Sequence, residues 1–125
     1  MILDTNALSA FVEGDRRLVS LLRAHEHLAI PVIVLGEYRF GIAASSKRDA
    51  YEGWLQQYLN RFDVLSINAE TADVYAALRM ALKAAGTPIP ANDAWIAALA
   101  LQHRLPLASR DAHFDHVRGL RRMAW

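Results

Sequence analysis

The sequence contains no cysteine, and this absence excludes disulfide bonds and cysteine-ligated metal sites. Long hydrophobic runs are also missing, since no stretch approaches the roughly 18 uninterrupted apolar residues of a membrane-spanning helix. An acid, Asp4, stands near the N-terminus where a secretory signal would carry basic residues. We therefore expect neither a membrane span nor a signal peptide, and the composition suits a cytoplasmic protein.

Net charge gives little information, because 14 basic and 13 acidic residues leave a formal charge of +1. Hydrophobic residues make up 54% of the chain and charged residues 22%, a composition typical of a packed globule. A chain of 125 residues can build one core, so we expect a single domain over residues 1–125. Short basic clusters are usually a solvated surface, and they are also compatible with a phosphate-backbone partner. The clusters contain Arg16, Arg17, Arg23, Lys47, Arg48, Arg118, Arg121 and Arg122.

Short apolar runs alternate with helix-like patterns along the chain. The runs predict strands at residues 1–4, 28–30, 62–67 and 105–109. The helical patterns fall at residues 6–12, 15–25, 31–45, 47–61 and 70–85, then from the loop "TPIPAND" to about residue 104, with a short helix after Asp111. We expect Pro31 to be the first residue of its helix. Strands separated by helices predict an α/β fold in which helices cover both faces of a parallel sheet.

The first acid of the chain ends an apolar run. The stretch "MILDTNALSAF" places Asp4 directly after Leu3 and before Thr5 and Asn6. One interpretation is a helix cap, since these polar side chains accept hydrogen bonds from the free N–H groups of a first turn. The other is a ligand site, since open α/β sheets bind ligands at the carboxyl ends of their strands. This stretch alone leaves both interpretations open.

Glu37 lies within the apolar segment "PVIVLGEYRFGIAAS". In a helix it shares one face with Ile33 and Gly41, and a carboxylate on an apolar face is costly unless something pairs with it. The alternative is a helix rotated so that Glu37 lies at its edge, paired with Arg39 or Lys47.

Asp93 and Asp111 resemble the first two acids in their placement. Asp93 follows Asn92, and either residue could simply cap a helix, yet Asp93 shares a face with the apolar Ile96 and Ala97. Asp111 follows the apolar run in "LPLASRD" and repeats the strand-end position of Asp4.

Together these acids favour a metal site. No lysine or arginine occupies an evident inward position, and converging carboxylates repel one another and hold protons unless a divalent cation joins them. Because the candidate ligands are all oxygens, the pattern predicts a hard cation, Mg²⁺ or Mn²⁺.

Four segments, in order along the chain, carry a family resemblance: "LDTNALSAF", "PVIVLGEYRFGI", "PANDAWIAALAL" and "LASRDAHFDHVRGLR". The chain resembles the PIN-domain nucleases and, more narrowly, the VapC-type toxins of bacterial toxin–antitoxin pairs. The resemblance implies a three-layer α/β/α PIN-like domain with a short parallel sheet flanked by helices. It also implies an endoribonuclease that needs Mg²⁺ or Mn²⁺, acts on RNA in the cytoplasm, forms a homodimer and binds a cognate antitoxin protein.

The resemblance also assigns residues by motif. The metal-binding and catalytic acids it implies are Asp4, Glu37, Asp93 and Asp111. The polar neighbours that would orient these ligands are Thr5, Asn6 and Ser109. Asp115 is not expected to be a ligand, and the motifs do not decide which acid positions the attacking water.

Other functions fit some of the same residues. A pair of histidines could cleave RNA without metal through the 2′-hydroxyl, from the set His25, His27, His103, His113 and His116. "DTN" faintly resembles the opening of haloacid dehalogenases, but Asn6 replaces their second acid. A catalytically silent RNA- or protein-binding module of the same fold is the main alternative. Trp95 could stack on an RNA base, although packing in a core or an interface is the favoured interpretation.

Overall fold

The computed structural model describes all 125 residues and is built on one parallel sheet of 5 strands. The strands are β1 (Ile2–Leu3), β2 (Ala29–Pro31), β3 (Asp63–Leu65), β4 (Leu107–Ala108) and β5 (Arg122–Met123). Their order in the sheet is β3-β2-β1-β4-β5, and every neighbouring pair is parallel. β1 is therefore the central strand.

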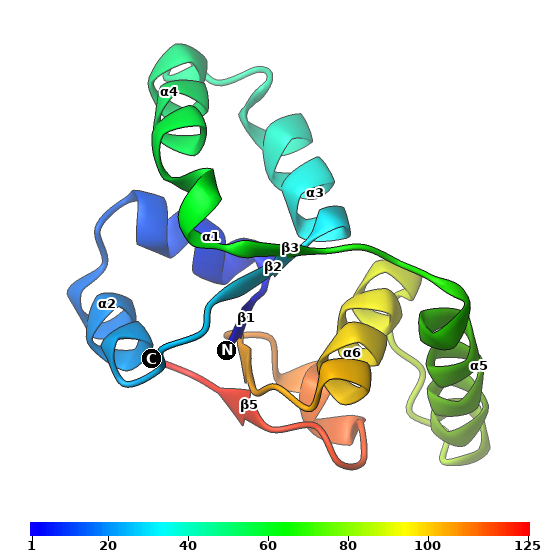
Figure 1. Cartoon of the computed structure of the whole chain (residues 1–125). Helices are drawn as coiled ribbons and strands as arrows, with labels where there is room; N and C mark the ends of the chain where they lie inside the picture. The colour runs from blue at the N-terminus through cyan, green and yellow to red at the C-terminus, as the bar shows by residue number, and fades with distance from the viewer.

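Helices cover both sides of this sheet. They are α1 (Thr5–Val12), α2 (Arg16–Arg23), α3 (Val32–Ile42), α4 (Arg48–Tyr58), α5 (Ala69–Ala84) and α6 (Ala91–His103), with 3-10 turns η1 (Leu59–Arg61) and η2 (Ala112–His116). In Figure 1, α2 and α5 lie on opposite sides of the sheet, with α6 between the sheet and α5. The predicted three-layer α/β/α architecture is confirmed. None of the helices combines the length and the apolarity that crossing a membrane would require.

The order of the strands determines where a site can form. The chain runs from β1 outward through β2 to β3, then returns to β4 on the other side of β1. Parallel sheets bind ligands at such a reversal, outside the carboxyl ends of the two strands that flank it. Here those strands are β1 and β4, and the N–H of Asp4 donates to the carbonyl of Ala108 at 3.1 Å.

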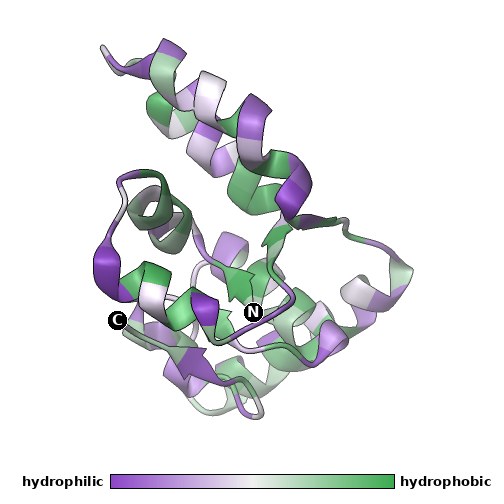
Figure 2. Ribbon diagram, turned by 60° about the vertical axis from the view of Figure 1, so that its left-hand side comes forward, coloured by the Kyte–Doolittle hydropathy of each residue, from purple (hydrophilic) through white to green (hydrophobic).

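The three central strands β1, β2 and β4 are buried, which explains their continuous apolar sequences. Ile2, Leu3 and Leu107 are fully buried, as are Ile96 of α6 and Phe114 of η2. Burying one such side chain contributes about 1.5–3 kcal/mol, so this layer holds the ends of β1 and β4 in place. Figure 2 shows the apolar strands at the centre of the molecule, with helices of mixed polarity around them.

Three helices begin at side-chain caps that the sequence supplies. Asp4 caps α1 by accepting from the N–H of Thr5, and Asp15 caps α2 by accepting from the N–H of Leu18 at 3.1 Å. Asn68 caps α5 in a reciprocal capping box. Asp4 is thus both a helix cap and a strand-end acid, so the two interpretations left open by the sequence are compatible.

Several predicted boundaries are wrong. Pro31 was expected to begin a helix, but it is the last residue of β2 and the extended N-cap of α3, with ψ 141°. The expected loop over residues 91–93 is the first turn of α6, and the helix predicted over residues 31–45 already ends at Ile42. The fifth strand, β5, was not predicted, because two residues with one charged side chain give no strand periodicity.

Candidate active site

Asp4 lies at the carboxyl end of β1 and is 5% exposed. Its Oδ1 accepts from the N–H of Thr5 at 2.7 Å, and its Oδ2 accepts from the hydroxyl of Ser109 at 2.6 Å and from the amide of Asn6 at 3.2 Å. Burial raises the pKa of Asp4, these hydrogen bonds oppose the rise, and the charge of Asp111 adds to it. The side chain is therefore fixed in position but held in surroundings that disfavour its charge.

The turn after β4 brings Asp111 to the same edge of the sheet. The N–H of Asp111 donates to Ser109 Oγ at 3.0 Å, so one hydroxyl links Asp4 and the backbone of Asp111. The N–H of Arg110 donates to Asn6 Oδ1 at 3.2 Å, which ties the turn to α1. Asn6 and Ser109, which were predicted to orient ligands, therefore make hydrogen bonds within this cluster. Thr5, the third such residue, donates its hydroxyl to Glu37.

Asp93 reaches this cluster from the first turn of α6, and its side chain is 18% exposed. Burial raises the pKa of Asp93, and the charges of Asp4 and Asp111 raise it further. The three aspartates therefore form one electrostatic cluster, although they come from three different elements of the fold.

His113 is the residue of the cluster that the sequence interpretation missed. Its Nε2 lies 3.0 Å from an oxygen of Asp93 and 2.5 Å from an oxygen of Asp111. In the sequence it was considered only as half of a histidine pair, but its partners here are carboxylates, and no hydrogen bond joins it to a second histidine. The feature of the sequence that could have identified His113 as a member of the cluster is its position two residues after Asp111, in a polar turn.

Glu37, the fourth predicted acid, lies on α3, which buries Val34 and Tyr38. Its Oε2 accepts from the hydroxyl of Thr5 at 3.1 Å, whereas its Oε1 is buried and has no hydrogen-bond partner. The alternative pairing with Arg39 does not occur, since Arg39 contacts Glu52 at 2.9 Å. A buried carboxylate oxygen without a donor costs free energy, so this atom is one that a water molecule or a cation would satisfy.

The donor set fits a divalent cation. Donor atoms of Asp93, Asp111 and His113 all lie within 4.8 Å of one another. No lysine or arginine makes a hydrogen bond or ion pair with any of the four acids. Carboxylate oxygens are the ligands that Mg²⁺ and Mn²⁺ prefer, and a cation would screen the repulsion between the aspartates.

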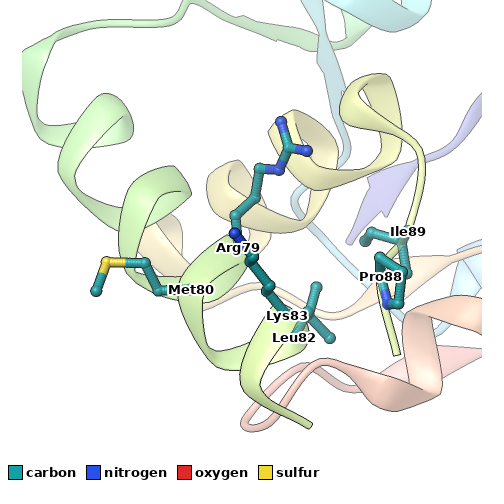
Figure 3. A pocket seen from close by; sticks show the side chains of 6 residues that line it. All are labelled: Arg79, Met80, Leu82, Lys83, Pro88 and Ile89. Carbon is teal, nitrogen blue, oxygen red and sulfur yellow. The ribbon is translucent and has the colours of Figure 1, made fainter. Parts of the chain in front are cut away.

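Other features lie apart from this cluster. A cavity of about 490 Å³ on α5 is lined by Arg79, Met80, Leu82, Lys83, Pro88 and Ile89 and contains none of the acids (Figure 3). Trp95 of α6 stacks on Tyr75 of α5 with ring centroids 3.7 Å apart, and its packing in a core or an interface stays a prediction.

Known proteins share both the sequence pattern and the fold. "Ribonuclease VapC4" of Mycobacterium tuberculosis is 34% identical over 84 residues, which span 66% of this chain and 65% of VapC4. "Toxin FitB" of Neisseria gonorrhoeae is 32% identical over 121 residues, 89% of this chain and 87% of FitB. The crystal structure of VapBC2 from Rickettsia felis, bound to a promoter DNA fragment, matches with a TM-score of 0.87 and 26% identity over 99% of this chain and 97% of that one. The PIN domain family model matches residues 1–120, and the chain therefore belongs to the PIN domain family.

Proposed function

We propose that residues 1–125 act as a single PIN-like nuclease domain, the toxin of a type II toxin–antitoxin pair, which hydrolyses phosphodiester bonds in RNA. The observation that carries the proposal is the cluster of Asp4, Asp93 and Asp111 at the sheet reversal, with Glu37 hydrogen-bonded to Thr5 beside Asp4. The similarity to proteins named ribonuclease and toxin supports it.

The four acids are the proposed ligands of Mg²⁺ or Mn²⁺. When bound, the cation supplies a Lewis acid that lowers the pKa of water and stabilises negative charge on phosphoryl oxygens. Ser109 and Asn6 hold Asp4 in place for this task, and Thr5 holds Glu37. Asp93 or Asp111 orients or deprotonates the attacking water, and no side-chain nucleophile is needed. The proposed location of this activity is the cytoplasm.

The proposed partners are a second copy of the chain and a cognate antitoxin. Phe40 is 86% exposed and Met80 is 72% exposed, which supports contacts between subunits. We expect the antitoxin to lay an apolar helix or extended segment in a groove of this chain and to direct a basic residue toward the acids. Light scattering that shows a monomer at high concentration would contradict the homodimer.

The test is cleavage of a structured RNA by the purified protein. We expect no cleavage in EDTA, recovery on adding excess Mn²⁺, and a loss of more than about a hundredfold in the Asp93→Asn variant. Asp73→Asn is the matched control, because Asp73 is an exposed acid of α5. This variant should cleave the RNA as the wild type does. Cleavage that persists in EDTA would support the histidine mechanism instead. An RNA mobility shift that ignores EDTA, without cleavage, would support the binding module.

A further inference from the structure

The C-terminal strand β5 lies directly beside the strand that delivers Ser109 and Asp111. β5 pairs with β4 in parallel, with Ala108 opposite Met123. The N–H of Ser109 donates to the carbonyl of Met123 at 3.2 Å, so the backbone pairing reaches into the site. This strand lies beyond residue 120, where the match to the family model ends.

Arg122 of β5 extends this pairing with its side chain, which is 18% exposed. Its Nη1 donates to the carbonyl of Ser109 at 3.1 Å. Its Nε and Nη2 donate to the two oxygens of Asp115 at 2.8 Å each. One planar guanidinium therefore donates hydrogen bonds to both ends of the turn from Ser109 to Asp115, a geometry that a lysine cannot reproduce.

The turn held in this way carries the polar groups of the site. Ser109 donates its hydroxyl to Asp4 and accepts from the N–H of Asp111, and the N–H of His113 donates to Asp111 Oδ1 at 3.2 Å. A shift of the turn would move all these groups together. Arg122 is also a cation whose charge attracts the carboxylate of Asp111 without touching it.

We propose that Arg122, anchored by Asp115, is a positioning residue that sets the geometry of Ser109 and Asp111 for the cation. The inference rests on the proposed function, since it assigns Arg122 a role toward the same acids. It also gives Asp115 a task without making it a ligand. The simpler alternative is that Arg122 only fastens β5 to the sheet.

The experiment measures Mn²⁺ binding by calorimetry and melting in EDTA, neither of which depends on cleavage. We expect Arg122→Gln to weaken Mn²⁺ binding by about tenfold, within the range found when groups behind metal ligands are removed. Arg122→Lys keeps the positive charge but loses the planar guanidinium that donates to both oxygens of Asp115. This variant should therefore weaken Mn²⁺ binding by an intermediate factor. The matched control is Arg121→Gln, since Arg121 is the exposed neighbouring arginine. The Arg121→Gln protein should bind Mn²⁺ as the wild type does.

Asp115→Asn keeps the test decisive if Arg122→Gln fails to fold. The Asp115 side chain is 55% exposed, so its change should leave melting in EDTA close to that of the wild type. It should nonetheless weaken Mn²⁺ binding, and saturating Mn²⁺ should restore the maximal cleavage rate.

Wild-type affinity for Mn²⁺ in both folded Arg122→Gln and Asp115→Asn would overturn the positioning role and leave the nuclease proposal intact. If the wild-type protein itself binds no Mn²⁺, the proposed site and this inference both fail.

Discussion

Two pairs of aspartates in this molecule have opposite surroundings. Asp4 and Asp93 lie at the sheet reversal without a lysine or arginine partner, and burial raises the pKa of each carboxyl. Asp15 and Asp115 lie at the surface. Hydrogen bonds from the backbone N–H of Leu18 lower the pKa of Asp15, and hydrogen bonds from Arg122 lower the pKa of Asp115. At Asp15 and Asp115 the hydrogen bonds and nearby arginines outweigh the cost of desolvating the charge, whereas at Asp4 and Asp93 burial and repulsion outweigh the hydrogen bonds.

This difference separates acids whose charge stabilises the folded state from acids whose charge opposes it, although Asp4 also caps α1. Asp15 caps a helix and pairs with Arg110, so its charge is useful in the folded state without any ligand. Asp4 and Asp93 repel each other and Asp111, so folding is opposed by the charges that the proposed chemistry needs. Such a balance between stability and activity is common at functional sites.

The largest expected effect concerns the cation. A ligand that binds only the folded state at about 100 times its Kd stabilises it by about 2.7 kcal/mol, so excess Mn²⁺ should raise the wild-type melting temperature by several degrees. Asp111→Asn should lose most of this rise, because one ligand is gone, while Asp115→Asn should keep much more of it. Calorimetric scans with EDTA and with Mn²⁺ give the two differences. Equal rises in the wild type and in Asp111→Asn would remove Asp111 from the site.

The site was easier to predict than the contacts that hold it. The strand-end positions of Asp4 and Asp111 and the inward position of Asp93 follow from local periodicity, and the structure brings the three acids together. Their role as metal ligands stays a prediction.

Contacts between distant segments left no local signal. His113 meets Asp93 across 20 positions of the chain, and Thr5 meets Glu37 across 32. β5 has no apolar alternation that would predict a strand. It is held by its backbone pairing with β4 and by the hydrogen bond from Arg122 to the carbonyl of Ser109. The helix ends were displaced for a similar reason, since Pro31 suits both a strand end and the position before a helix.

A smaller effect should appear in the pH dependence of the metal-free protein. An acid whose pKa is raised on folding contributes stability that is complete below its unfolded pKa, near 3.8, and is lost as the pH rises through the folded value. In EDTA the contribution of these acids to the free energy of unfolding should therefore increase as the pH falls from neutral toward the unfolded pKa near 3.8. Asp4→Asn isolates one acid, because Asp4 has no histidine partner, and this variant should show a weaker increase. Equal changes in the wild type and in Asp4→Asn over this range would contradict the assignment.

The smallest expected effect is that single substitutions shift the melting temperature of the metal-free protein in opposite directions. In EDTA, Asp93→Asn should melt at or above the wild-type temperature, because it removes a repelled charge and keeps an oxygen for His113. Asp15→Ala should melt below the wild type, because the first turn of α2 loses the acceptor for Arg17 and Leu18. Asp15→Asn is its control, since an asparagine oxygen caps a helix about as well as a carboxylate. The melting curves of the wild type, these three variants and Asp111→Asn are recorded at neutral pH and one protein concentration. If Asp93→Asn and Asp111→Asn both melt well below the wild type, these acids support the fold as Asp15 does, and the repulsion that motivates the metal site is absent.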